Sequence, residues 1–143
     1  MDIVIELSPQ SALIFSKLFP IEEYYCPPIE ILAEEIISRG QFNLIHHKSG
    51  LKIDIIIRKI DAFSVQEFKR RIKMPFVEGM EVYIATPEDI IIKKILYFKE
   101  GRTEKHLIDI KGILANTEVD ENYLKKWIKV LLLDKEWKEI IKK

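Results

Sequence analysis

The stretch QFNLIHHKSGLKIDIIIR, residues 41–58, decides the fold. Two runs rich in apolar and β-branched residues, 42–47 and 51–58, flank a Ser-Gly turn, a pattern typical of an antiparallel β-hairpin. Successive side chains of a strand point to opposite faces, so Ile53, Ile55 and Ile57 of the second run share one face. Its other, mixed face is formed by Lys52, Asp54, Ile56 and Arg58.

Upstream of this hairpin, the sequence predicts one more strand and two helices. Residues 2–7 alternate, with isoleucine and leucine on one face and Asp2, Val4 and Glu6 on the other. A helix is expected to open at Ser8–Pro9 and to end at Pro20, and a second one to cover about residues 28–39 before Gly40. The isoleucine-rich strands therefore have helices available to cover one face.

Downstream, the pattern changes from strands to helices. Ser64 and Glu67 predict a capping box for a short helix that ends near Arg70, and residues 72–77 and 81–85 predict a second hairpin. Helices are then expected over about 86–98, 103–115, 120–132 and from Asp134 onward. We predict an α+β protein in which a small mixed or antiparallel sheet covered by helices (1–85) precedes a C-terminal helical bundle (86–143).

Composition narrows the class of protein. The chain has 143 residues, 48% of them hydrophobic, which excludes intrinsic disorder. Its 23 basic and 23 acidic residues cancel, so no overall field attracts a polyanion such as nucleic acid. Charged residues interrupt every apolar run before the roughly 18 residues that a membrane span needs, and no signal peptide is recognised. With Cys26 as its only cysteine, the chain is expected to be cytoplasmic and not to contact a membrane.

Asp2 and Asp54 are the acidic residues that most need an explanation, because both lie in isoleucine-rich strands. A buried carboxylate costs several kcal/mol unless it is paired, hydrogen-bonded or bound to a cation. Two interpretations stay open. The two residues are either ordinary surface groups, with Asp54 paired to Lys52 or Arg58, or the ligands of a divalent metal ion. A two-metal site would need a third ligand, which the sequence does not supply.

Three segments carry a resemblance to a known family: DIVIELSP (2–9), FNLIHHKSGLKID (42–54) and ATPEDIIIKK (85–94). In their order and spacing they resemble the minimal nucleotidyltransferases of the DNA polymerase beta superfamily, which include relatives of abortive-infection toxins. The resemblance implies a nucleotidyltransferase-like fold. It also implies that Mg²⁺ assists transfer of a nucleoside monophosphate from an NTP, with ATP expected, to an acceptor that the sequence does not identify.

The same resemblance assigns roles to the two aspartates. Asp2 matches the second member of the family's Asp-x-Asp pair, and Asp54 matches the third carboxylate, so both are implied catalytic metal ligands, with Asp54 also a base toward the acceptor hydroxyl. The family's Gly-Ser turn and first Asp would precede Met1. The resemblance therefore implies an N-terminally truncated chain whose activity is reduced or lost.

A nucleotide-binding role is implied for three residues of the helical region. Lys94 and the segment KHLIDI (105–110) are similar to family members, which points to Lys94, His106 and Asp109 as the polar lining of a cleft, with Lys94 neutralising phosphate charge. His106 and Asp109 are three residues apart and can meet on one helical face. The alternative is a surface pair that rims the core.

Two classes of function therefore stay open. One is a nucleotidyltransferase. The other is a non-catalytic interaction module on the same scaffold, such as a toxin–antitoxin component. Unpaired strand edges beside apolar residues also predict self-association into a homo-oligomer.

Overall fold

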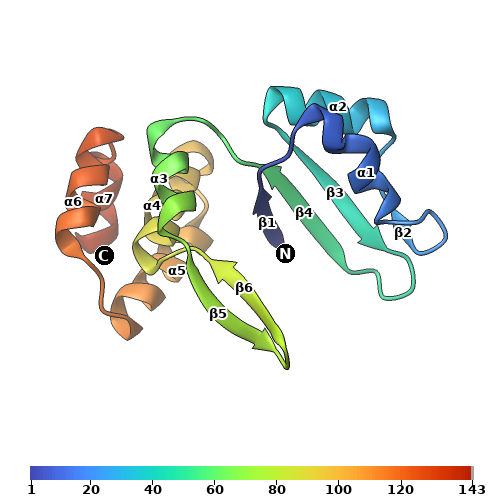
Figure 1. Ribbon diagram of the computed structural model, residues 1–143. Helices are drawn as coiled ribbons and strands as arrows, with labels where there is room; N and C mark the ends of the chain where they lie inside the picture. The colour runs from blue at the N-terminus through green and yellow to red at the C-terminus, as the bar shows by residue number, and fades with distance from the viewer. Residues whose placement is uncertain (143) are drawn as a thin grey trace. The chain divides into compact units, whose positions relative to one another are not determined.

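The computed structural model describes residues 1–142 and confirms a mixed α+β fold with a helical C-terminal region (Figure 1). The chain forms two compact units, one from Met1 to Val65 and one that starts at Gln66. This division falls earlier than the boundary at residue 85 that we drew from the sequence. The second hairpin forms a two-stranded sheet of its own instead of joining the larger sheet, so it groups with the helices that follow it.

The first unit is built on a four-stranded mixed sheet in the order β1-β4-β3-β2. Strand β1 (Asp2–Ile5) runs parallel to β4 (Lys52–Ile57), whereas β3 (Gln41–His46) is antiparallel to both β4 and the short β2 (Tyr24–Tyr25). The predicted central hairpin is therefore confirmed. Its turn includes Gly50 at φ +67°, a left-handed conformation that glycine adopts without strain.

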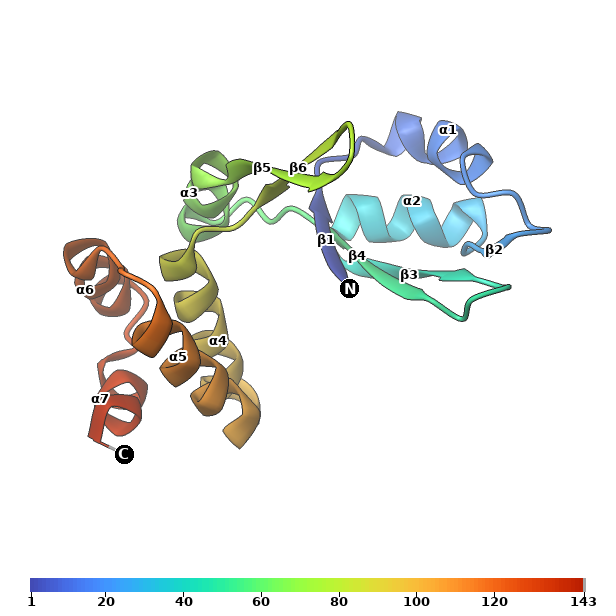
Figure 2. The same cartoon turned by 90° about the horizontal axis from the view of Figure 1, so that it is seen from below.

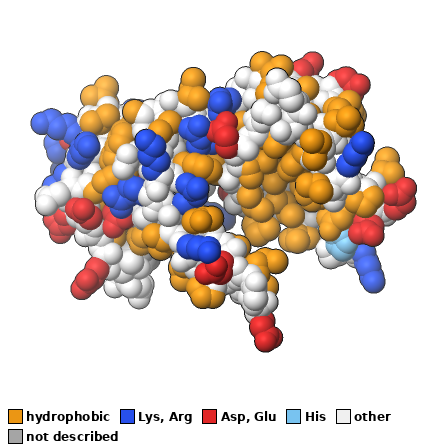
Figure 3. All heavy atoms as spheres, in the orientation of Figure 1, with side chains coloured by type: hydrophobic (Ala, Val, Ile, Leu, Met, Phe, Trp, Pro, Cys, Tyr) orange, Lys and Arg blue, Asp and Glu red, His pale blue; other side chains and the backbone are white. Residues whose placement is uncertain are grey.

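Helices cover one face of this sheet (Figure 2). A 3₁₀ turn (Pro9–Ser11) leads into α1 (Ala12–Lys17), and α2 (Ile29–Ser38) follows β2. Figure 3 shows hydrophobic side chains gathered on the side of this unit that carries the two helices. The buried core between helices and sheet consists of Ala12, Leu32, Ile36, Phe42, Leu44, Ile55 and Ile57.

The connection from α2 to β3 depends on a close approach at Gly40. A Cβ at this position would lie 1.9 Å from Oε2 of Glu35. That carboxylate oxygen accepts a hydrogen bond from the backbone N–H of Gln41 at 2.9 Å, so it links the end of the helix to the first residue of the strand. Any larger residue at 40 would displace it.

The second unit combines a hairpin with helices. Helix α3 (Ala62–Arg70) crosses the division and leads into the hairpin of β5 (Ile72–Val77) and β6 (Met80–Ile84). The remaining helices are α4 (Pro87–Gly101), α5 (Glu104–Asn116), α6 (Glu121–Val130) and α7 (Asp134–Lys142). Within residues 1–142, no helix is long and apolar enough to cross a membrane. The buried side chains of these four helices include Ile91, Ile92, Ile95, Phe98, Ile110, Leu124, Ile128 and Ile140.

Two helix starts confirm the sequence prediction and one corrects it. Thr86 and Asp120 cap α4 and α6, and their side chains accept hydrogen bonds from the backbone N–H three residues later. The expected capping box at Ser64 is wrong, because α3 begins two residues earlier. Asp61 does the capping instead: its carboxylate accepts from the Ser64 N–H at 2.9 Å and from the Ser64 hydroxyl at 2.6 Å.

Candidate functional site

The sheet register brings Asp2 and Asp54 side by side. They are direct partners in the parallel ladder between β1 and β4, and neighbouring strands lie about 4.8 Å apart. Residues in register point to the same face of a sheet. Since Ile55 and Ile57, which pair with Ile3 and Ile5, belong to the helix-covered side, both aspartates lie on the opposite side, where α1 and α2 do not cover them.

The third strand extends this arrangement. Asn43 of β3 is the ladder partner of Asp54, so three polar side chains cross three strands in one line. Asp2 is exposed, whereas Asn43 and Asp54 are half-buried. We call Asp2, Asp54 and Asn43 the polar row. Their carboxylate and amide oxygens are the kinds of ligand that Mg²⁺ accepts.

Asp54 has a cationic neighbour on its own strand. Lys52, two residues earlier on the same face, places its Nζ 3.4 Å from Oδ1 of Asp54. The side chains are 56% and 33% exposed, and an ion pair this exposed contributes little to stability. The Asp54–Lys52 pairing that the sequence left open is therefore present, and a metal ion would have to compete with it.

Arg58, the other partner considered for Asp54, pairs elsewhere. Its guanidinium contacts Glu6 at 2.6 Å, and Arg39 contacts the same carboxylate at 3.1 Å. Arg39 also donates to the backbone carbonyl of Arg58 at 2.6 Å. Two arginines and one glutamate thus connect the ends of β1, β4 and α2, and they leave Asp54 to Lys52.

In the second unit, the structure brings Lys94 and Asp109 together. Lys94 of α4 donates to Oδ2 of Asp109 on α5 at 2.6 Å. This hydrogen bond, with the charges of Lys94 and Lys105, holds the pKa of Asp109 below its usual range. The ion pair links two helices, and in this state the lysine charge is already balanced.

The sequence allowed a hydrogen bond between His106 and Asp109, but the structure shows none among the described residues. Its ring lies 5.7 Å from that of Tyr97, and its buried Nδ1 has no hydrogen-bond partner among the described residues. The predicted residues thus form two groupings, each inside one unit. One is Asp2 with Asp54, and the other is Lys94 with Asp109, beside His106.

The most extensive polar cluster of the second unit was missed from the sequence. Asp89 is completely buried at the start of α4, where its carboxylate accepts hydrogen bonds from the Thr86 hydroxyl at 2.8 Å and the Tyr123 hydroxyl at 2.7 Å. Arg70 lies over the Tyr123 ring, 3.6 Å from its centre, with its Nε 3.3 Å from Asp89 Oδ2. Burial and the bond to the Asp89 carboxylate raise the pKa of Tyr123.

Glu88 extends the cluster to the start of α6. One carboxylate oxygen accepts from Arg70 at 2.9 Å and the other from the backbone N–H of Asp120 at 2.9 Å. Burial alone would raise the pKa of Glu88, but these contacts lower it. We call this cluster the Asp89 network, and it joins α3, α4 and α6. Its members are Arg70, Thr86, Glu88, Asp89, Asp120 and Tyr123.

The sequence contained a signal for this cluster that we interpreted only as helix capping. Thr86 and Asp89 were recognised as a cap, which is confirmed, and Tyr123 was placed in a core stripe. A tyrosine in a core stripe needs a partner for its hydroxyl, and a second acid beside a cap needs a cation. Together these requirements point to a buried polar network, whose role is to hold helices together.

Neither grouping forms a complete metal centre from protein ligands. Within residues 1–142, no group of three or more His, Cys, Asp or Glu side chains is arranged to hold a metal ion. The polar row supplies two carboxylates and an amide. An ion bound there would take its remaining ligands from water or from a substrate, as Mg²⁺ commonly does when it binds phosphates.

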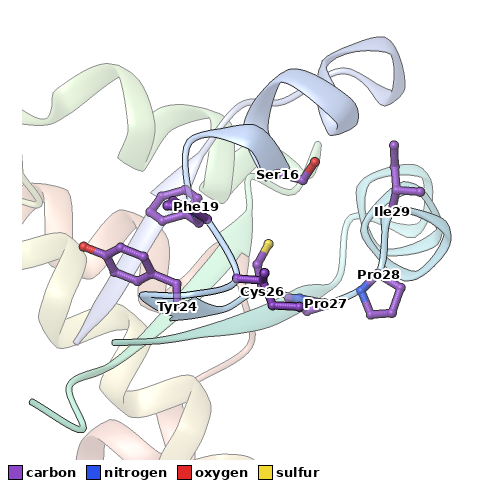
Figure 4. Close-up of a pocket in the computed structure, with 9 residues that line it drawn as sticks. Ser16, Phe19, Tyr24, Cys26, Pro27, Pro28 and Ile29 are labelled. Carbon is purple, nitrogen blue, oxygen red and sulfur yellow. The ribbon is translucent and has the colours of Figure 1, made fainter. Parts of the chain in front are cut away.

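Two hollows of the first unit lie away from the polar row. A shallow pocket of about 280 Å³ lies between the end of α1 and the start of α2 (Figure 4). Its lining is largely apolar, and burial raises the pKa of the Cys26 thiol there, which disfavours the reactive thiolate. A second hollow, near His46, contains no metal-binding group of the kind sought above. The first pocket is lined by Ser16, Phe19, Pro20, Ile21, Tyr24, Cys26, Pro27, Pro28 and Ile29.

No protein-family model matches this chain, and no curated protein is significantly similar to it. The function proposed below therefore rests on the residues and their geometry, together with the resemblance described above.

Proposed function

We propose that this chain is a nucleotidyltransferase-like protein that binds an NTP with Mg²⁺ at the polar row. One observation carries the proposal: Asp2 and Asp54, 52 residues apart in the sequence, are direct neighbours in a parallel ladder and share a face. Two acids on adjacent strands repel each other unless a cation lies between them. A divalent ion with a polyphosphate would supply both the charge and the missing ligands.

The chemistry follows from the groups present. Asp2 and Asp54 would hold the ion, which supplies charge stabilisation for the phosphates. In the transfer that the resemblance implies, an acceptor hydroxyl attacks the α-phosphorus, the bond to the β-phosphate breaks and pyrophosphate leaves. Asp54 would take the proton of the attacking hydroxyl. Lys52 then has a second use, because its ammonium group is close enough to Asp54 to meet phosphate oxygens when the ion displaces it.

A second candidate is a module on the same scaffold that binds nucleotide without turning it over. The observation that favours it is the number of ligands. Among residues 1–142, the polar row offers two carboxylates, and no third one completes a metal-binding group. Removing one ligand from a coupled two-metal site costs far more rate than affinity, because positioning fails while binding persists.

Metal binding is the first test. Mn²⁺, which can be followed by electron paramagnetic resonance, should bind the wild type, and Asp54→Asn and Asp2→Asn should each weaken the binding at least tenfold. Glu34→Gln, which removes an exposed charge from α2, is the matched control and should bind normally. An affinity tag belongs at the C-terminus, because the Met1 amino group lies 3.3 Å from the Lys52 carbonyl, next to the site. Equal binding by all four proteins would refute the proposal.

Turnover separates the two candidates. Wild type incubated with MgATP and a panel of protein, RNA and small-molecule acceptors should release pyrophosphate if the chain transfers nucleotide, and Asp54→Asn should abolish the release. If MgATP raises the melting temperature of the wild type but not of Asp54→Asn, and no pyrophosphate forms, the binding module is the correct function.

A further inference from the structure

The hairpin of β5 and β6 is two-sided. Cross-strand partners share a face, so the ladder Ile72–Ile84, Met74–Val82 and Val77–Met80 forms one side, while Lys73–Tyr83 and Pro75–Glu81 form the other. The register of the ladder shifts between Pro75 and Val77, and Phe76 lies at this β-bulge. We call the first side the hairpin face. Its six residues, all apolar, are Ile72, Met74, Val77, Met80, Val82 and Ile84.

The opposite side already has its partners. Lys73 and Glu81 form an ion pair across the two strands. Arg71 stacks over the rings of Phe68 and Tyr83, at 4.1 Å and 4.7 Å from their centres, and so ties this side to α3. The orientation of the hairpin relative to α3 is therefore set by these contacts.

The hairpin face remains exposed. Ile72, Met74 and Ile84 are 43%, 42% and 40% exposed, and Val77 and Met80 are 55% and 52% exposed. In Figures 1 and 2 the hairpin extends away from the helices of its own unit. A two-stranded hairpin is marginally stable by itself in water, and a contiguous apolar face of this kind marks an interaction surface.

We propose that the hairpin face is the interface of a homodimer, in which two copies of this chain pack their hairpin faces against each other around a two-fold axis. Five of the six side chains are 40–55% exposed and Val82 is partly buried, so packing two such faces together would bury on the order of 1,000 Å² in total, the lower limit for a specific interface. A two-fold interface requires a surface that is complementary to itself.

Charge and chemistry favour a second copy over other occupants. The hairpin face has no charged or hydrogen-bonding side chain, so it offers nothing to a phosphate, a nucleotide or an acidic peptide. A copy of the same face is flat, apolar and of equal length. The chain has a net charge of zero, so two copies do not repel each other at long range. This interface is independent of the polar row, which belongs to the other unit.

The test measures mass against concentration, by sedimentation equilibrium of the full chain. Wild type should approach twice 16.9 kDa. Met74→Lys places a charge in the middle of the hairpin face and should weaken dimerisation about 30-fold or more. Pro75→Lys is the matched control: it introduces the same residue one position along, on the other side and opposite Glu81, and should dimerise like wild type. Ile84→Lys repeats the test from β6 in case Met74→Lys does not fold.

Each outcome decides. Folded monomers for Met74→Lys and Ile84→Lys, with a dimer for Pro75→Lys, support the interface. A wild type that is monomeric at every concentration overturns the proposed interface. If Met74→Lys then also has a lower melting temperature than wild type, the hairpin face is covered by another part of the same chain. Dimers for all four proteins also overturn it, because the contact then lies elsewhere.

Discussion

The two acidic groupings of this protein differ in how many of their oxygens are in use. Asp89 is fully buried, and both of its carboxylate oxygens accept hydrogen bonds from hydroxyl groups, with Arg70 close by. Asp2 and Asp54 lie on the side of the sheet opposite the core, where an exposed lysine, Lys52, pairs with Asp54. A carboxylate whose oxygens are all in use holds a fold together, whereas one with free oxygens is available to a ligand.

The largest loss of stability should come from mutating the buried carboxylate, Asp89. Asp89→Ala leaves the charge of Arg70 and the hydroxyl of Tyr123 without their partner, so we expect a loss of about 3–5 kcal/mol in the free energy of unfolding, as when one partner of a buried ion pair is removed. Urea denaturation followed by circular dichroism measures it. Asp54→Asn is the control and should change stability by no more than about 0.5 kcal/mol. Equal losses for the two variants would abolish the distinction.

A smaller effect is expected from Tyr123→Phe. The ring still packs under Arg70, but Asp89 loses one hydrogen bond, and a hydrogen bond to a charged group contributes about 1.5–3 kcal/mol. The same denaturation experiment measures the loss. A variant as stable as wild type would show that the Thr86 hydroxyl alone is sufficient for Asp89.

The alkaline range gives a further test of the same hydroxyl. Folding raises the pKa of Tyr123 above its ordinary value of about 10, so the neutral phenol stabilises the fold fully below that pH, and the contribution is lost as the pH rises toward the folded-state pKa. The difference in unfolding free energy between wild type and Tyr123→Phe should therefore shrink above about pH 10. A difference in unfolding free energy that does not change with pH would mean that the phenol has the same pKa in the folded and unfolded states.

How much of this molecule could be predicted from sequence differs between the same two regions. The hairpin at 41–58 and strand β1 followed from alternation, and Gly50 marked the turn. The proximity of Asp2 and Asp54 came from a resemblance and not from a pattern, because parallel pairing of strands 50 residues apart leaves no local signal. The Asp89 network escaped because its members, Arg70, Asp89 and Tyr123, come from three helices, and each one satisfied a simpler local explanation.

The division of the chain shows the same limit. Both hairpins were predicted, but sequence alternation does not tell which sheet a hairpin joins. Only the strand pairing in the structure shows this: in the part of the chain that the structure describes, residues 72–84 pair only among themselves. The prediction of Ser64 instead of Asp61 as the cap of α3 is a local error, because both residues have side chains that can cap a helix and they lie within one turn of each other.

The smallest expected effect concerns metal binding at the exposed pair, Asp2 and Asp54. Lys52→Gln removes the cation that competes for Asp54, so Mn²⁺ alone should bind about two- to fivefold more tightly, in keeping with the modest strength of exposed ion pairs. With MgATP the gain should be smaller, because the lysine no longer meets phosphate. Weaker binding of the bare ion would mean that Lys52 orients Asp54 instead of blocking it.

The parallel pairing of β1 with β4 also determines when the polar row can assemble during synthesis of the chain. A ribosome that has released Asp2 must add more than fifty residues before Asp54 emerges, whereas the β3–β4 hairpin closes over a short loop. Strand β1 has a single neighbour and pairs through four residues, so its amide protons should exchange with solvent well before those of β4. The chain can thus detach one of the two aspartates proposed to bind metal while the rest of the sheet stays intact.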